Sequence, residues 1–114
     1  MASIAEIKLE KNAAVKKAEE VLFQVIDREN NTSGAEQAKW AKARLELEDL
    51  INKLNAQAFE RALDEAQPAF DALRRVSGEL ESAAGRMRSA TEFINALNDL
   101  LGAANTALDT LKKP

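Results

Sequence analysis

The chain has 114 residues, with 16 basic and 19 acidic side chains and a formal net charge of −3. This length suits one domain and is too short for two domains with separate cores, and the acidic balance argues against nucleic acid or an anionic membrane as the partner. The chain has 22 Ala and 14 Leu but only four Val and no Tyr, so residues that favour helices far outnumber those that favour strands. We therefore expect a single all-α domain.

Cysteine is absent, which excludes disulfide and thiol chemistry. The first residues, MASIAEIKLEKNAAVKK, lack the apolar region of a secretory signal, so we expect a cytoplasmic protein. Residues 89–111 contain no Lys or Arg, but polar and acidic side chains interrupt this stretch too often for a membrane span. The interrupting residues are Glu92, Asn95, Asn98, Asp99, Asn105 and Asp109.

A first helix is predicted over about residues 3–29. Ser3 and Glu6 have the spacing of a capping box, in which each side chain accepts a hydrogen bond from the other residue's amide. Apolar residues then recur at steps of three and four until a cluster of turn-forming residues, 28–34, ends the pattern. The predicted buried stripe consists of Ile4, Ile7, Ala14, Ala18, Val21, Leu22 and Val25.

A second helix is predicted over about residues 34–66, opened by a second capping box at Ser33 and Glu36. Trp40 has the same helical phase as Leu47 and Leu54, which favours core packing over a role as a binding anchor. The opposite side carries a second apolar strip. This strip predicts a central helix packed between two others, or alternatively a surface open to a partner. Its members are Ala38, Ala41, Leu45, Ala56, Phe59 and Leu63.

The boundary before the last helix has two candidates, Pro68 and the pair Ser77-Gly78. A proline inside a helix costs about 3 kcal/mol and a glycine about 1 kcal/mol, so we place the break near Pro68. A continuous second helix that turns at Ser77-Gly78 is the alternative.

The third helix is predicted over about residues 68–111, because heptads run through the glycines without a slip. The resulting fold is an antiparallel bundle of three long helices, or four if the last one breaks at Gly78 or Gly85. The first heptad position holds Leu73, Leu80, Met87, Ile94, Leu101 and Leu108, and the fourth holds Val76, Ala83, Ala90, Leu97, Ala104 and Leu111.

The residues available for chemistry argue against an enzyme. Histidine and cysteine are both absent, which removes the commonest general base and the strongest common nucleophile. No nucleotide-binding glycine pattern or metal-ligand cluster is present. Arg75 and Arg88 each precede a glutamate by four residues, which predicts a solvated, ion-paired face rather than an anion site. We expect no catalytic residues, no cofactor and no metal.

The expected function is therefore binding of a protein partner. Leu9 and Phe23 lie nearly on one line of the first helix, away from its buried stripe, and the second strip adds further apolar candidates. We expect the chain to bind and mask a partner, as an immunity protein, antitoxin, chaperone or adaptor does. The alternative is a homodimer or larger assembly through the seam at Leu80, Met87, Ile94, Leu101 and Leu108. The predicted partner-binding residues are Leu9, Phe23, Leu45, Phe59 and Leu63.

Overall fold

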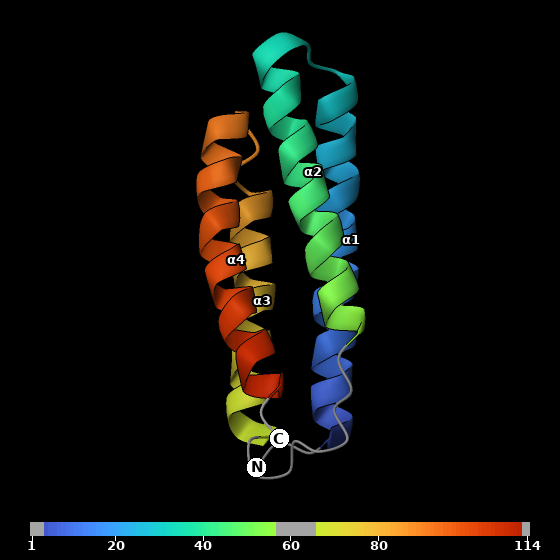
Figure 1. Ribbon diagram of the computed structural model, residues 1–114, viewed down its shortest axis with the longest axis vertical. Coiled ribbons are helices and arrows are strands. Elements are labelled where there is room, and N and C mark those ends of the chain that lie inside the picture. The colour runs from blue at the N-terminus through green and yellow to red at the C-terminus, as the bar shows by residue number, and fades with distance from the viewer. Residues whose placement is uncertain (1–3, 57–65, 113–114) are drawn as a thin grey trace.

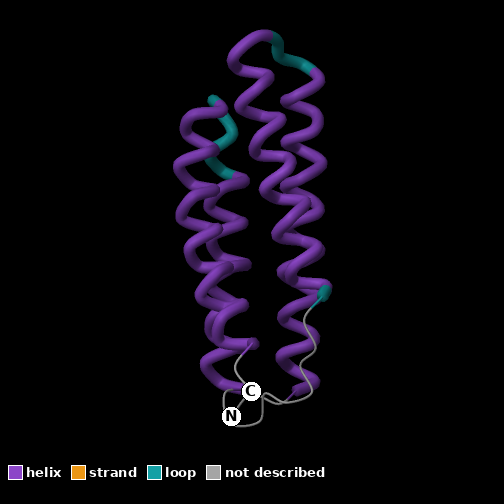
Figure 2. The backbone as a smooth tube through the Cα atoms, viewed as in Figure 1, coloured by secondary structure: helices purple, strands orange, loops and turns teal. Residues whose placement is uncertain are grey.

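The residues that the structure describes form four helices, and each helix is antiparallel to the one that follows it along the sequence (Figure 1). A computed structural model describes residues 4–56 and 66–112, which form a rod of 48 × 21 × 18 Å. The helices are α1 (Ile4–Asn30), α2 (Gly34–Asn55), α3 (Ala66–Ala84) and α4 (Ala90–Lys112). Short turns join α1 to α2 and α3 to α4, which gives two helical hairpins (Figure 2).

The two hairpins pack side by side, with α3 against α1 and α4 against α2. Both α1 and α3 ascend in Figure 1, so these neighbours are parallel, as are α2 and α4. The α2–α4 contact is the least extensive of the four, and the diagonal pairs make no contact among the described residues. The prediction that the second helix is central is therefore wrong, because α2 occupies a corner of the bundle.

The first helix agrees with its prediction. The predicted stripe is buried from Ile7 to Val25, and Leu22 packs against it in a partly buried position. The carbonyl groups of the last turn are capped from beyond the helix, because Thr32 Oγ1 donates to the Arg28 oxygen at 2.8 Å and Gln37 Nε2 to the Glu29 oxygen at 2.9 Å. The turn between α1 and α2 is thus tied to both helices. Ser3, the predicted first cap, lies outside the described residues.

The second predicted capping box does not form. Ser33 has the extended backbone of an N-cap but makes no capping hydrogen bond through its side chain. Glu36 instead reaches across to the other hairpin, where its Oε1 accepts a hydrogen bond from the backbone N–H of Ala90 at 2.9 Å. The spacing of Ser33 and Glu36 predicts a cap at the start of α2, but the Glu36 carboxylate instead caps the start of α4.

Burial along α2 confirms one predicted stripe and contradicts the interpretation of the other. Leu47 and Leu54 are fully buried as predicted, whereas Leu45 is 57% exposed and Ala38 is exposed. Among the described residues, no third helix covers Ala38 and Leu45 of the second strip, so the prediction of a helix packed between two others through both strips is wrong. The helix itself ends at Asn55, and residues 57–65 of its predicted extent to 66 lie outside the described residues.

The last predicted helix, residues 68–111, is two helices. The break near Pro68 is confirmed, because α3 begins at Ala66 and places Pro68 in its first turn, where a missing N–H leaves no helical bond unmade. The helix then passes Gly78 without interruption and ends at Ala84. The prediction of one continuous helix is wrong, because the chain turns at Gly85. The alternative prediction of four helices is confirmed.

The heptad phase changes beyond this turn, from Phe93 onward. Phe93 and Leu100 are fully buried, whereas the heptad positions that follow them, Ile94 and Leu101, are only partly buried. Ser89 opens α4, because its Oγ accepts a hydrogen bond from the Glu92 N–H at 3.2 Å. Ser89 and Glu92 have the spacing of a capping box, in addition to the two predicted ones.

The helices share one core of small and branched apolar side chains. Trp40 is 1% exposed, and its ring centroid lies 5.4 Å from that of Phe93 in a tilted arrangement. The predicted core position of Trp40 is confirmed. Since these rings come from α2 and α4, they anchor the least extensive contact between the helices.

Candidate functional site

The predicted contact residues that the structure describes are all strongly exposed. Leu9 and Phe23 are each 69% exposed and Leu45 is 57% exposed, and these are the exposed large hydrophobic residues among the side chains that the structure describes. All three belong to the α1–α2 hairpin. Phe59 and Leu63, the other predicted contact residues, lie outside the described residues.

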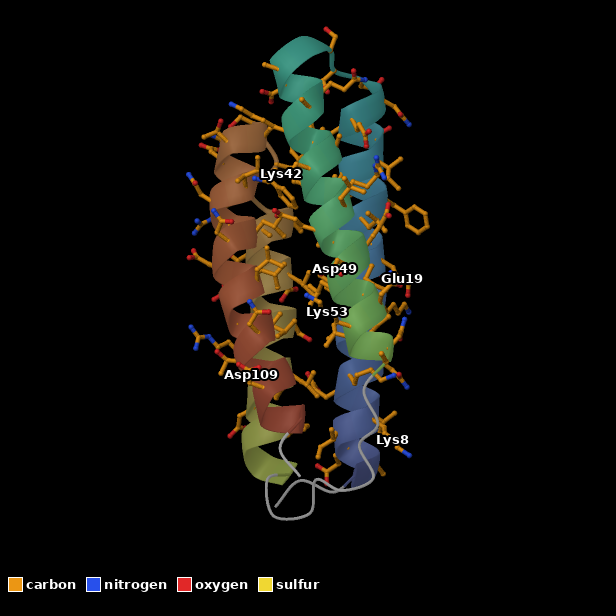
Figure 3. All side chains as sticks on the ribbon, viewed as in Figure 1. Lys8, Glu19, Lys42, Asp49, Lys53 and Asp109 are labelled. Atoms are coloured by element: carbon orange, nitrogen blue, oxygen red, sulfur yellow. The ribbon has the colours of Figure 1, made fainter. Side chains whose placement is uncertain are left out.

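These three side chains do not form one continuous patch. Leu9 and Phe23 are fourteen residues apart on the outer side of α1, which separates them by about 21 Å along the axis. Leu45 precedes the buried Leu47 by two residues, so it points away from the core on α2. Charged side chains lie on the same outer surfaces, including the labelled Lys8, Glu19, Lys42, Asp49 and Lys53 (Figure 3). The hairpin therefore offers separate apolar contacts within a charged surface.

A shallow groove runs between the outer sides of α1 and α2. Its hollow of about 240 Å³ is lined by the partly buried Leu22 and Ile51 and by the polar side chains of Glu19, Glu48 and Asn52. Both apolar side chains are partly buried and also pack against the core. The groove is thus mainly a helix–helix junction with an acidic rim.

An ion-pair cluster closes the upper part of this junction. Arg44 Nε donates to Glu29 Oε1 at 2.6 Å, and Arg44 Nη1 donates to Glu48 Oε1 at 3.1 Å. The hydrogen bonds from Arg44 to the two carboxylates raise the pKa of its guanidinium, with the bond to Glu29 contributing most. The cluster links the end of α1 to the middle of α2 and leaves Arg44 committed within the hairpin.

A larger hollow, of about 450 Å³, lies beside the exposed Phe23 ring. Ala84 and Met87, from the end of α3 and the turn after it, line the hollow opposite α1. Met87 is only 7% exposed, so the hollow reaches the edge of the core. Gln24, Asp27 and Arg28 form the polar part of its wall. This is the place where a predicted contact residue adjoins a concave surface.

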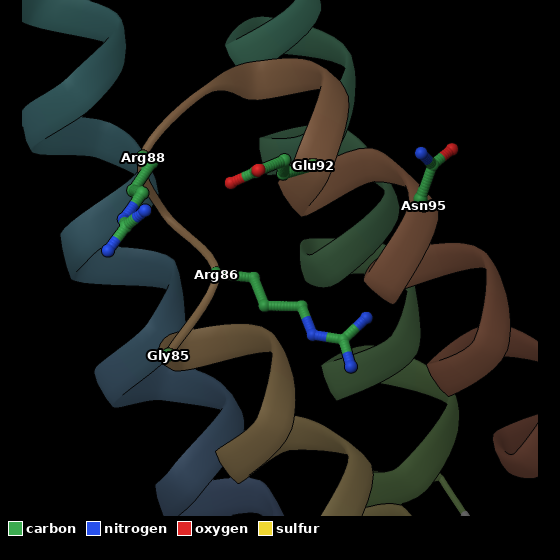
Figure 4. A pocket seen from close by; sticks show the side chains of 5 residues that line it. All are labelled: Gly85, Arg86, Arg88, Glu92 and Asn95. Atoms are coloured by element: carbon green, nitrogen blue, oxygen red, sulfur yellow. The ribbon is translucent and has the colours of Figure 1, made fainter.

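A second hollow, of about 400 Å³, lies on the other side of the α3–α4 turn and is mainly polar. Arg86 and Arg88 both line this hollow, and their side chains extend from the turn in different directions (Figure 4). Neither arginine makes an ion pair with a described residue. The predicted ion pair between Arg88 and Glu92 is therefore not formed, and neither is the one between Arg75 and Glu79.

The heptad seam proposed for self-assembly is mostly enclosed by the chain itself. Leu80 is fully buried and Met87 nearly so, whereas Ile94 and Leu101 are partly buried. The side chain of Leu108 lies outside the described part of the chain. The seam thus contributes its large residues to the core of one chain.

Sequence reasoning missed the polar link between α2 and α4. Glu36 caps Ala90, and Lys39 Nζ donates to Thr91 Oγ1 at 3.2 Å, so two side chains of α2 hold the first turn of α4. Their long separation in sequence left no local signal for either contact. Only the capping spacing of Ser89 and Glu92 marked the position of this helix end.

Searches of the described residues found neither a metal-binding group nor a membrane segment. No three acidic side chains there are grouped so that they could hold a metal ion. None of the described helices combines the length and apolar character needed to cross a bilayer. Comparison with known protein families, with curated proteins and with solved structures found no match for this chain.

Proposed function

We propose that this chain is a non-enzymatic, cytoplasmic binding module that masks the surface of a partner protein. The observation that carries the proposal is the exposure of Leu9, Phe23 and Leu45 on a single hairpin, beside a core that is otherwise closed. Exposed large apolar side chains at interfaces bury against a partner, and aromatic rings are frequent anchors. The role is that of an immunity protein, antitoxin, chaperone or adaptor, which acts by occupying a surface.

The position of these residues on regular helices supports this role. The Arg44 ion pairs and the capped turn link α1 to α2, so the apolar side chains project from two regular helices that are tied together. A rigid surface loses little conformational freedom when it binds, which favours affinity. The surrounding charges suit the polar rim of an interface and favour specificity.

The test compares the wild-type chain with the variant L9S/F23S/L45S. Because each side chain is more than half exposed, we expect the variant to keep its helix content and to change in unfolding free energy by about 0.5 kcal/mol or less per site. Partners are captured from the native extract by the tagged wild-type chain, identified, purified and titrated against both proteins. The proposal predicts that affinity falls by at least about a hundredfold for the variant, as loss of several interface anchors requires.

A matched control distinguishes the loss of an apolar contact from the effect of any substitution on this face of α1. Lys16 lies between Leu9 and Phe23 on the same face of α1 and is exposed. The single change Lys16→Ser should alter affinity far less than Phe23→Ser does. Equal affinity of the wild-type chain and L9S/F23S/L45S for the same purified partner would show that the hairpin surface is not the interface.

A further inference from the structure

The groove between α1 and α2 is lined by two carboxylates, and no lysine or arginine is among its described lining residues. Glu19 comes from α1 and Glu48 from α2, and the partly buried Leu22 and Ile51 supply the apolar surface between the two helices. Figure 3 shows Glu19 at the edge of the molecule that lies away from α3 and α4. The groove is therefore open on a side that the second hairpin does not cover.

The cation that pairs with Glu48 does not neutralise this groove. Arg44 shares its single charge between Glu29, at 2.6 Å, and Glu48, at 3.1 Å, and its bond to Glu48 uses Oε1 and leaves Oε2 as an acceptor for another cation. Glu19 makes no ion pair with a described residue, and neither does Lys16, one turn before it. Three carboxylates thus face one guanidinium at this junction, which leaves an excess of negative charge.

Each carboxylate of the groove has an exposed apolar neighbour on its own helix. Phe23 follows Glu19 by four residues and Leu45 precedes Glu48 by three, so each pair lies on one face, one turn apart. Phe23 and Leu45 are both more than half exposed. An aromatic ring beside a carboxylate suits a guanidinium, which pairs with the carboxylate and lies against the ring. Apolar and anionic features therefore coincide along this groove.

We infer that this groove binds a basic segment of the partner protein, with one apolar side chain seated over Leu22 and Ile51. Lys or Arg side chains on either side of that residue pair with Glu19 and Glu48. The inference rests on the proposed function and specifies the chemistry of the partner. The hollow of about 240 Å³ has room for about one side chain, and a groove between two helices suits a segment that passes over the surface.

The test is a selection from a random peptide library displayed on phage, with the full-length wild-type chain as bait. The expected peptides carry Lys or Arg around one large apolar residue. The consensus peptide is then titrated by fluorescence anisotropy, and its affinity should fall as the salt concentration rises, because the flanking contacts are ionic. Peptides without basic residues, or with affinity independent of salt, would overturn the inference.

Matched variants place the peptide on the molecule. We expect E19Q/E48Q to weaken binding at least about tenfold, because both ionic contacts lose their charge. Glutamine at position 48 retains a side-chain oxygen that can accept the Arg44 bond, so the fold should persist. The control E20Q/E46Q removes the same charge from the same two helices outside the groove lining and should change affinity by about twofold or less. Equal losses for the two variants would overturn the inference.

Amide chemical shifts of the wild-type chain give an independent readout that needs no variant to fold. The peptide should shift the signals of Glu19, Leu22 and Ile51. A peptide that shifts signals only outside the groove, and binds E19Q/E48Q as tightly as the wild-type chain, would overturn this site and leave the proposed function intact. Selection of no peptide would also overturn the inference, whereas the affinity of the purified partner for L9S/F23S/L45S decides the proposed function separately.

Discussion

Glu36 stabilises a helix other than its own, and removing it tests how the two hairpins are joined. Its carboxylate accepts the hydrogen bond of the Ala90 N–H, one of the amides that α4 cannot satisfy internally. The substitution Glu36→Ala removes this acceptor and the negative charge near the positive end of the helix dipole. No other described side chain provides a hydrogen bond to that amide.

The expected loss of unfolding free energy follows from the geometry of the hydrogen bond between Glu36 and Ala90. Loss of an N-cap costs about 0.5–2 kcal/mol, and a partly buried carboxylate bond of 2.9 Å lies in the upper half of that range, so we expect about 1–2 kcal/mol. For a chain of 114 residues, each kcal/mol lowers Tm by about 4 °C. The predicted decrease in Tm is therefore about 4–8 °C.

Urea denaturation followed by circular dichroism measures the free energy, and hydrogen exchange locates the effect. Amide exchange should accelerate at the start of α4 and remain unchanged in the α1–α2 turn. Glu46→Ala is the matched control, because Glu46 lies on the same helix without a hydrogen bond or ion pair to another described residue. If Glu36→Ala and Glu46→Ala lower stability equally, or exchange at Ala90 does not change, the tertiary cap contributes nothing.

Three further changes test the packing. Trp40→Ala should cost about 3–5 kcal/mol in the same denaturation assay, because the side chain is 1% exposed, and a cost below about 1 kcal/mol would contradict its core position. Gly85→Ala should leave the chain a folded monomer in light scattering, because an added Cβ would lie at an ordinary contact distance of 3.5 Å from the Ser82 carbonyl oxygen. If the variant were a dimer instead, α3 and α4 would have joined into one long helix, and the turn would not be an intrinsic feature of the chain. Arg44→Met should lower Tm at low salt by releasing Glu29 and Glu48, and the difference should shrink in about 1 M NaCl. The fold raises the pKa of Arg44, so the stability that its charge contributes is fully present below the ordinary pKa of arginine and is lost only above the raised pKa. The Tm difference between the wild-type chain and Arg44→Met should therefore be the same at neutral and at mildly alkaline pH. A difference that varies between these pH values would contradict the stabilising role of the Arg44 charge.

Local patterns predicted most of the secondary structure. The apolar periodicity of α1 and the turn-forming residues after it set the bounds of that helix within a residue or two, because both signals act over a few neighbouring positions. The relative costs of proline and glycine also placed the break near Pro68 and kept Gly78 inside a helix.

The turn at Gly85 was predicted only as an alternative to a continuous helix, because both of its sides contribute to one core. Met87 and Ala90 are buried at their heptad positions, so the repeat continues across a turn that folds back onto the bundle. The slip becomes visible only at Phe93, which is buried in place of Ile94. A heptad pattern reports which side chains face a core, and it does not report that the backbone between them is helical.

The candidate site was predicted in part. The positions of Leu9, Phe23 and Leu45 outside the buried stripes identified exposed residues, since angular position on a helix follows from spacing alone. The hollow beside Phe23 could not be found in this way. Its opposite wall comes from Ala84 and Met87, which reach α1 only because the second hairpin packs with α3 parallel to α1.

The proposed function requires that the core of the bundle close within one chain, so that Leu9, Phe23 and Leu45 stay available to a partner. Light scattering after size exclusion, at several protein concentrations and with circular dichroism of the same fractions, tests this claim most directly. We predict a helical monomer at every concentration, with constant helix content. A dimer or larger species that loses helix content on dilution would contradict the account, because folding would then depend on a second copy.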